Sequence, residues 1–241
     1  MASELRGRGI LVTRPREQAA GLARLIEQAG GRAHLFPAID IQDLPPPGAL
    51  SRLREFDLAI FISPTAVSRV FRHLKTLPSQ VRAAAVGAGT RRELERHGVT
   101  QVISPSSGAD SEALLAQPEL EIFRNIVIFR GEDGRALLGE TLAGHGARVE
   151  YAACYRRARP QVPGKAWKPG EIDAVTVSSA QGLANLFEML DPGLLQATPL
   201  FVPHARIAEQ GRARSVREVV IAGPSDEEML DRLVAYFRSH D

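Results

Sequence analysis

The apolar run Ile10-Leu11-Val12-Thr13-Arg14 is matched, 116 positions further along the chain, by Ile126-Val127-Ile128-Phe129-Arg130. The same offset places the run Leu58-Ala59-Ile60-Phe61 on Ala174-Val175-Thr176-Val177. Further identities at this spacing are Gly30 and Gly146, Arg32 and Arg148, Asp57 and Asp173, Ser63 and Ser179, Phe71 and Phe187, and Val86 and Val202. Because the apolar pattern shifts together with these identities, the sequence predicts two copies of one structural unit.

Each copy alternates short apolar runs with segments of helical period. In the first copy, a strand at 10–13 precedes an amphipathic helix at 17–28 and a second strand at 32–36. Further strands are expected at 58–62, 83–86 and 101–103, with helices at 65–74, 91–97 and 111–115. Strands that alternate with helices predict right-handed crossovers and parallel sheets, so the expected fold class is α/β, with two parallel-sheet domains from an internal duplication.

Two proline clusters, at 44–48 and 159–170, interrupt the copies at the same relative place. Each copy therefore divides into an early strand–helix–strand piece and a later piece. Either each copy folds as its own domain, or the early piece of one copy docks with the later piece of the other. In the second arrangement, the extended segments at 37–41 and 151–157 pass between the domains side by side, although their pattern also suits a sheet edge.

The composition excludes several classes of protein. The chain has 241 residues, of which 44% are hydrophobic and 24% charged, as in globular proteins. A formal net charge of +2 does not indicate a nucleic-acid-binding protein. No apolar run approaches the roughly 20 residues of a membrane span and no secretory signal is visible, so we expect a cytoplasmic protein. The single cysteine, Cys154, excludes an internal disulfide and a multi-thiolate zinc site.

Candidate binding residues follow the expected strands, because parallel sheets bind ligands beyond the carboxyl ends of their strands, at helix N-termini. Small or capping residues stand there in the loops 63–65, 87–90, 131–134 and 178–180. Arg14, Arg130 and Arg135 lie at or just beyond strand ends, where guanidinium groups could bind carboxylates or phosphates. Each feature also has a structural explanation, since caps terminate helices and arginines commonly solvate a surface.

Standard catalytic signatures are missing from the sequence. Gly87-Ala88-Gly89 does not complete a dinucleotide fingerprint, no phosphate-binding loop motif is present, and the six histidines lack metal-ligand spacing. We therefore expect neither a nucleotide cofactor nor a metal, and interpret Cys154 as a small buried hydrophobic residue. Tyr155 could donate a proton to a leaving group, because it is protonated at neutral pH. The alternative, which residue chemistry alone favours, is a core tyrosine with a hydrogen-bonded hydroxyl.

The succession of motifs resembles the uroporphyrinogen-III synthase family over nearly the whole chain. These motifs are Ile10–Pro15, Phe61–Val67, Ala85–Thr90, Phe129–Gly131 with Arg135, Tyr151–Arg157 and Val177–Ser179. The resemblance implies two α/β domains joined by a two-stranded connector, the first built from both chain ends. The implied limits are 1–36 plus 158–241 for one domain, 41–150 for the other, and 37–40 and 151–157 for the connector strands.

The resemblance also implies a reaction. The family cyclises hydroxymethylbilane, a linear tetrapyrrole with eight carboxylates, with loss of water and inversion of the last pyrrole, without cofactor or metal. Tyr155 matches the tyrosine proposed to assist departure of the hydroxyl. The substrate-binding residues expected on this basis are Arg14, Ser63, Thr65, Gly87, Thr90, Arg130, Gly131, Arg135, Ser178, Ser179, His204 and Arg206.

One segment departs from the family pattern. Pro203-His204-Ala205-Arg206 stands where many members have small Gly and Thr residues. His204 or Arg206 could bind a carboxylate in their place, or His204 could cap the helix that follows. We expect a monomer that acts on a small molecule, with transient contact to the preceding enzyme of the pathway, and neither nucleic acid nor membrane as a partner. The alternatives are a two-lobed anion-binding module and a tetrapyrrole sensor without turnover.

Overall fold

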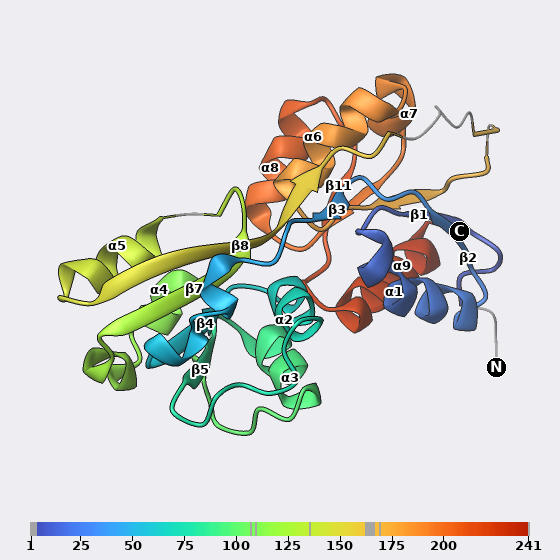
Figure 1. The fold of residues 1–241 in the computed structure, drawn as a ribbon. Helices are drawn as coiled ribbons and strands as arrows, with labels where there is room; N and C mark the ends of the chain where they lie inside the picture. The colour runs from blue at the N-terminus through green and yellow to red at the C-terminus, as the bar shows by residue number, and fades with distance from the viewer. Residues whose placement is uncertain are drawn as a thin grey trace. The chain divides into compact units, whose positions relative to one another are not determined.

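The computed structural model describes residues 4–106, 108, 110–134, 136–161, 167–168 and 170–240. Internal contacts divide the chain into two compact units, drawn in Figure 1. Unit 1 comprises Met1–Asp40 and Ala158–Asp241, and unit 2 comprises Ile41–Arg157. Unit 1 is therefore built from both ends of the chain. The limits implied by the family resemblance and the two-stranded connector stay a prediction.

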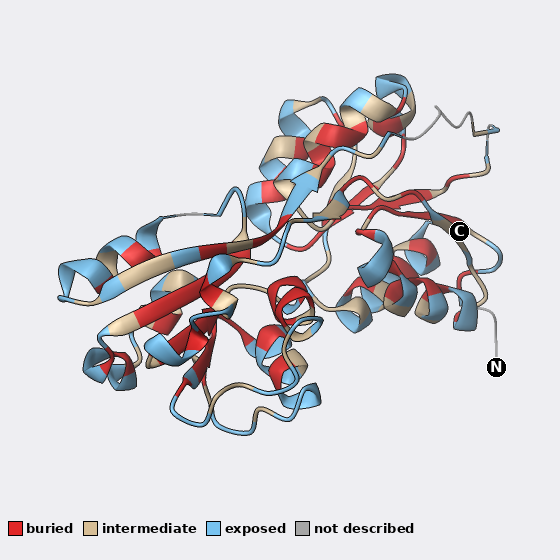
Figure 2. Cartoon of the chain, viewed as in Figure 1, coloured by how far each residue is buried: buried red, intermediate tan, exposed pale blue. Residues whose placement is uncertain are grey.

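Unit 2 contains a six-stranded sheet in the order β3-β8-β7-β4-β5-β6. The strands are β3 (Asp40–Asp43), β4 (Leu58–Phe61), β5 (Arg82–Ala85), β6 (Val102–Ile103), β7 (Asn125–Gly131) and β8 (Arg148–Ala158). The pairs from β8 through β6 run parallel. All four residues of β4 are buried, and Figure 2 shows the central strands in the colour of buried residues. Such continuous apolar runs are typical of parallel strands covered on both faces.

Helices cover both faces of this sheet. On one face lie α2 (Pro64–Phe71) and α3 (Ala88–Arg96), with the short 3-10 turns η1 (Gly48–Leu50) and η2 (Leu53–Glu55), around a cluster that includes Phe61 and Phe129. On the other face lie α4 (Ser111–Leu115), η3 (Pro118–Ile122) and α5 (Leu137–Gly144), around Ile60 and Ile128. Each large apolar side chain buried in this way contributes about 1.5–3 kcal/mol.

Unit 1 has a five-stranded parallel sheet in the order β11-β10-β9-β1-β2. Its strands are β1 (Gly9–Val12), β2 (Arg32–Leu35), β9 (Ala174–Thr176), β10 (Leu200–Val202) and β11 (Val219–Ile221). One face packs against α1 (Arg16–Gln28) and α9 (Asp226–Ser239), and the other against α6 (Ala180–Met189), α7 (Pro192–Ala197) and α8 (Ala205–Ala213). Within the described residues, no helix combines the length and the apolar character needed to cross a membrane.

Strand pairing connects the two copies of the sequence repeat. β1 pairs with β9, and β7 pairs with β4, so the early piece of each copy lies beside the later piece of the other. This is the second of the arrangements that the sequence leaves open. The strand expected at 37–41 lies later, because β3 occupies Asp40–Asp43. Ala38 is instead hydrogen-bonded within unit 1: its N–H donates to the carbonyl of Thr13, and its carbonyl accepts the side-chain amide of Asn185.

Residues that lie 116 positions apart make corresponding hydrogen bonds in the two units. Asp57 precedes β4, and its carboxylate accepts the backbone N–H groups of Arg124 and Asn125 at 2.9 and 3.0 Å. Asp173 precedes β9, and its carboxylate accepts the N–H of Gly9 at 2.7 Å and the guanidinium of Arg8 at 3.1 Å. Each aspartate therefore accepts hydrogen bonds from the backbone at the start of the neighbouring strand. That the two units arose by duplication stays a prediction.

This correspondence predicts matched losses of stability. Asp57→Asn weakens the charged acceptor for the start of β7, and Asp173→Asn does the same for β1. We expect each substitution to lower the free energy of unfolding by about 1–3 kcal/mol. Hydrogen exchange measured residue by residue checks this, with faster exchange in unit 2, which contains β7, in the first variant and in unit 1, which contains β1, in the second. Asp231→Asn, on an exposed position of α9, is the control; equal effects in all three variants would contradict the assignment.

Candidate active site

Two helices of unit 2 begin side by side at the carboxyl end of its sheet. Ser63 is the N-cap of α2, where its side chain accepts the N–H of Ala66 at 3.1 Å, and Gly87 is the N-cap of α3. A Cβ on Gly89 would lie 3.8 Å from Pro64, which places the two helix starts together. The first N–H groups of a helix have no acceptor inside it, and this end carries a partial positive charge. The adjoining starts of α2 and α3 therefore favour an anion.

A register shift between β7 and β8 orients Tyr155. The strands pair regularly as far as Arg130 with Ala153, after which Gly131 pairs with Tyr155 and Cys154 is left as an extra residue. Side chains four residues apart on a regular strand share a face, so Tyr155 would otherwise lie on the α5 face with Tyr151. Instead, Tyr155 belongs to the core cluster beneath α2. An extra residue in a strand commonly re-aims a side chain in this way.

The hydroxyl of Tyr155 contacts the start of α2. Its Oη lies 2.9 Å from Oγ of Ser63, and only 2% of the residue is exposed. A Cβ on Gly131 would lie 2.9 Å from the phenol ring, so glycine at that position lets the ring rest against β7. The phenol is thereby linked, through Ser63 and the N–H of Ala66, to the positive end of the helix.

Arg130 is buried and holds down the loop that follows β7. Its Nε donates to the carbonyl of Gly131 at 3.1 Å, and its guanidinium lies 4.8 Å from the ring centroid of Tyr151. The hydroxyl of Tyr151 donates to the carbonyl of Ala136 at 2.7 Å. Gly134 passes directly over the guanidinium, since a Cβ there would lie 2.5 Å from it. Arg130 and Tyr151 thus fix this loop against the sheet.

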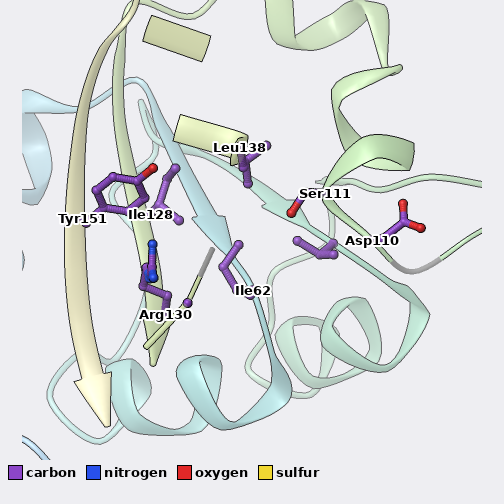
Figure 3. A pocket seen from close by; sticks show the side chains of 9 residues that line it. Ile62, Asp110, Ser111, Ile128, Arg130, Leu138 and Tyr151 are labelled. Carbon is purple, nitrogen blue, oxygen red and sulfur yellow. The ribbon is translucent and has the colours of Figure 1, made fainter. Parts of the chain in front are cut away.

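Two adjoining cavities open at this place. The larger, about 220 Å³, appears in Figure 3, with Arg130 beside Tyr151 and with Ser111 and Asp110 across from them. The rest of its lining is Ile62, Val86, Ile128, Gly134 and Leu138. The smaller, about 80 Å³, is lined by Ile62, Arg130, Gly131, Glu132, Asp133, Gly134, Tyr155 and Arg157. The larger cavity is mostly apolar, with one guanidinium from Arg130 and one carboxylate from Asp110, and it is below the usual size of a whole-ligand pocket.

The charges around the smaller cavity are mixed. Glu132 and Asp133 face Arg130 and Arg157 in its lining. The guanidinium of Arg157 lies 6.0 Å from the ring centroid of Tyr155. Because acidic and basic side chains are equal in number here, net side-chain charge does not attract an anion to this part of unit 2.

In unit 1, the expected site residues follow β1, β9 and β10. Ser179 is the N-cap of α6 and accepts the N–H of Gly182 at 3.0 Å, with Ser178 half-buried before it. His204 is the N-cap residue of α8 but its side chain makes no cap hydrogen bond, and Arg206 is exposed in the first turn. This first turn contains no acidic residue. A cation at the positive end of a helix is unfavourable, and a bound anion would relieve that cost.

Arg14 is already engaged inside unit 1. Its guanidinium forms an ion pair with Asp226 in the first turn of α9 and donates to the carbonyl of Pro224 at 3.4 Å. Only 16% of the Arg14 side chain is exposed. Any carboxylate that reached this arginine would compete with Asp226.

The structure thus brings part of the expected set together. In unit 2, five of the expected residues lie at the carboxyl end of the sheet: Ser63, Gly87, Arg130, Gly131 and Tyr155. Thr65 and Thr90 are buried, with 7% and 4% of each residue exposed. Arg135 lies outside the described residues. The sequence analysis missed Tyr151, Asp110 and Ser111 as cavity residues. Asp110 could have been found from the sequence, because aspartate is a preferred N-cap and it precedes the helix expected at 111–115. No sequence pattern predicts that Tyr151 stacks on Arg130.

Cys154 is not a nucleophile at neutral pH. It is 4% exposed, and its Sγ donates to the carbonyl of Ala152 at 3.4 Å. Burial raises the pKa of the thiol to about 12, so it stays protonated. The interpretation of this residue as a small buried hydrophobic one is confirmed.

Comparison with known proteins decides the family. The family model described as Uroporphyrinogen-III synthase HemD matches residues 20–231. The uroporphyrinogen-III synthase of Escherichia coli K12 is 29% identical over 242 residues, covering 92% of this chain and 98% of that protein. That of Chlorobaculum parvum is 31% identical over 196 residues, covering 75% and 78%.

The chain belongs to the uroporphyrinogen-III synthase HemD family. Solved structures agree in fold: the Helicobacter pylori enzyme aligns with a TM-score of 0.67 at 16% identity, over 95% of this chain and 99% of that one. A mutant Thermus thermophilus enzyme of the family aligns with a TM-score of 0.60 at 19% identity, over 97% and 98%. The α/β fold with parallel sheets, expected from the sequence, is confirmed.

The burial of Cys154 predicts its reactivity. In the folded protein at pH 8, we expect a small thiol reagent to modify Cys154 only at the rate of unfolding, because the thiol is neutral and covered. Adding urea through the unfolding transition accelerates the modification. Cys154→Ala retains cyclisation activity. Rapid stoichiometric labelling of the folded protein, followed by mass spectrometry, would contradict the inert thiol.

Proposed function

We propose that Tyr155 is the acid of the family's reaction, in which this enzyme cyclises hydroxymethylbilane to uroporphyrinogen III in tetrapyrrole biosynthesis. The observation that carries the proposal is the placement of its hydroxyl 2.9 Å from Ser63 Oγ, at the positive start of α2 and beside a cavity. Departure of the substrate hydroxyl as water requires one proton. A phenol at the positive end of a helix can supply it, because the charge that remains on the phenol oxygen is favoured there.

Substrate binding rests mainly on the backbone. Hydroxymethylbilane carries eight carboxylates, and the adjoining starts of α2 and α3 offer N–H groups that favour anions. The 220 Å³ cavity accepts one pyrrole ring against Ile62 and Ile128, with its carboxylate toward Arg130. In unit 1, the starts of α6 and α8 bind further carboxylates, and His204 and Arg206 replace the small residues of other members.

Few reactive side chains are needed for this chemistry. The pyrrole nitrogen donates electrons as the C–O bond breaks, and the resulting cation is attacked within the same molecule. Holding a flexible chain in the reactive shape contributes several kcal/mol by removing the entropic cost of ring closure. Fixed dipoles that face the developing charges contribute further. The choice of isomer then follows from the shape in which the substrate is held.

The test is cyclisation of freshly made hydroxymethylbilane with chromatographic separation of isomers. Tyr155→Phe lowers kcat by about tenfold, below the usual 10²–10⁴-fold effect of a general acid because this leaving group departs readily. The product remains the type III isomer, since the fold still shapes the substrate. An unchanged kcat would remove the acid role of Tyr155. Wild-type protein that binds the bilane but yields only the spontaneous type I isomer would instead indicate a tetrapyrrole sensor.

The first turn of α8 gives a separate prediction. Arg206→Ala raises KM by about threefold at low salt and by less at high salt, because the lost attraction is exposed and screened. The same change leaves thermal stability equal or slightly higher, since it removes a cation from the positive helix end. Arg212→Ala, in the last turn of the same helix, is the matched control and leaves KM unchanged. A rise in KM that does not depend on salt would indicate a packing role.

A further inference from the structure

We propose that Ser63 is a positioning residue for Tyr155: its hydroxyl donates a hydrogen bond to Tyr155 Oη, so that the phenol proton is directed to the departing hydroxyl of the substrate. The inference rests on the proposed role of Tyr155 as the acid. It assigns to Ser63 a function distinct from that of a substrate-binding group or a helix cap.

The hydrogen-bond inventory leaves two arrangements for this pair. Oγ of Ser63 accepts the N–H of Ala66 at 3.1 Å and lies 2.9 Å from Oη of Tyr155. A serine hydroxyl has one hydrogen to donate. If Tyr155 donates to Ser63, the phenol proton is held in an internal bond. If Ser63 donates to Tyr155, the phenol proton is available to substrate.

The direction from serine to tyrosine is favoured by polarisation. The N–H of Ala66 points at Oγ from the positive end of α2, and a hydroxyl that accepts a hydrogen bond becomes a stronger donor. In this arrangement Ala66 donates to Ser63, and Ser63 donates to Tyr155. A chain with this polarity favours negative charge at its end, which is the phenol oxygen.

Burial makes this donor necessary. Only 2% of Tyr155 is exposed, so bulk water does not solvate a phenolate at this position. A buried charged oxygen without a hydrogen-bond donor is costly, and bonds to a charged acceptor are stronger than neutral ones. Ser63 therefore contributes more after proton transfer than before it.

The proton transfer is balanced as follows. The C–O bond of the substrate breaks, its electron pair stays on oxygen, and that oxygen takes the proton of Tyr155 and leaves as water. The pyrrole nitrogen supplies electrons to the methylene carbon and becomes cationic. Tyr155, now a phenolate, accepts the hydrogen bond of Ser63. The proton released when the cyclised pyrrole regains aromaticity returns to the phenolate.

A second serine of the chain, Ser179, caps a helix in the same way but has no tyrosine beside it at the corresponding position. Ser179 lies 116 residues after Ser63, is the N-cap of α6, and accepts the N–H of Gly182 at 3.0 Å. The residue that corresponds to Tyr155 at this offset is Ile39, which has no hydroxyl. Ser179→Gly therefore reports what removal of such a cap does by itself, without any phenol.

The first measurement is the Raman doublet of tyrosine, which distinguishes a phenol that accepts a hydrogen bond from one that donates. The chain has three tyrosines, so the Tyr151→Phe, Tyr236→Phe protein leaves Tyr155 as the sole reporter. In this protein, Tyr155 gives the spectrum of an acceptor, and Ser63→Gly abolishes that signature. Ser179→Gly does not. A donor spectrum with Ser63 present would overturn the proposal.

The second measurement is the kinetics of cyclisation. Glycine is an acceptable N-cap, so Ser63→Gly retains the helix start while removing the hydroxyl. We expect Ser63→Gly to lower kcat about fivefold with little change in KM, and Ser63→Thr to restore kcat. In the Tyr155→Phe background, Ser63→Gly has no further effect, because coupled residues are not additive.

The outcomes separate the two proposals. If Tyr155→Phe leaves kcat unchanged, the proposed acid role fails. If Tyr155→Phe lowers kcat but Ser63→Gly does not, or if the two losses add independently, the acid role stands and the positioning role of Ser63 is overturned.

Discussion

The candidate site depends on one extra residue between β7 and β8. Cys154 has no partner position in β7, and its insertion moves Tyr155 from the α5 face of the sheet to the α2 face. Only on the α2 face can the phenol contact Ser63, which follows β4 at the carboxyl end of the sheet. Cys154 itself stays on the α2 face with Ala152, where it is buried. A local change in strand register thus determines which helix start the tyrosine hydroxyl contacts.

The sequence predicts the strands and helices because their periods and apolar runs are long enough to read, as at 10–13 and 17–28. It leaves the pairing of the pieces open, since two similar copies offer each other equivalent sheet edges. It does not predict the face of Tyr155, because neither glycine nor proline marks the register shift within β8. Nor does it show that Arg14 is paired with Asp226, a contact between residues 212 positions apart.

The charge distribution fits a protein that binds its substrate through main-chain dipoles. Arg14 is neutralised by Asp226, and Arg130 is occupied by the Gly131 carbonyl and the Tyr151 ring. Glu132 and Asp133 add negative charge beside the smaller cavity. A strongly cationic surface would bind eight carboxylates tightly in substrate and product alike, which lowers KM without raising kcat. In the proposed function, helix starts at fixed positions discriminate by geometry instead.

Three glycines let the side chains of the candidate site pack closely against the backbone. Gly131 admits the Tyr155 ring, Gly134 admits the Arg130 guanidinium, and Gly139 of α5 admits the Tyr151 hydroxyl. At each position a Cβ would force one of these side chains to move. Glycine loses more conformational entropy on folding than other residues, and the close packing at these positions offsets that loss. Because an aromatic or guanidinium group fills each space, Tyr155, Arg130 and Tyr151 are closely packed at these glycines, which favours a site whose side chains are placed before substrate binds.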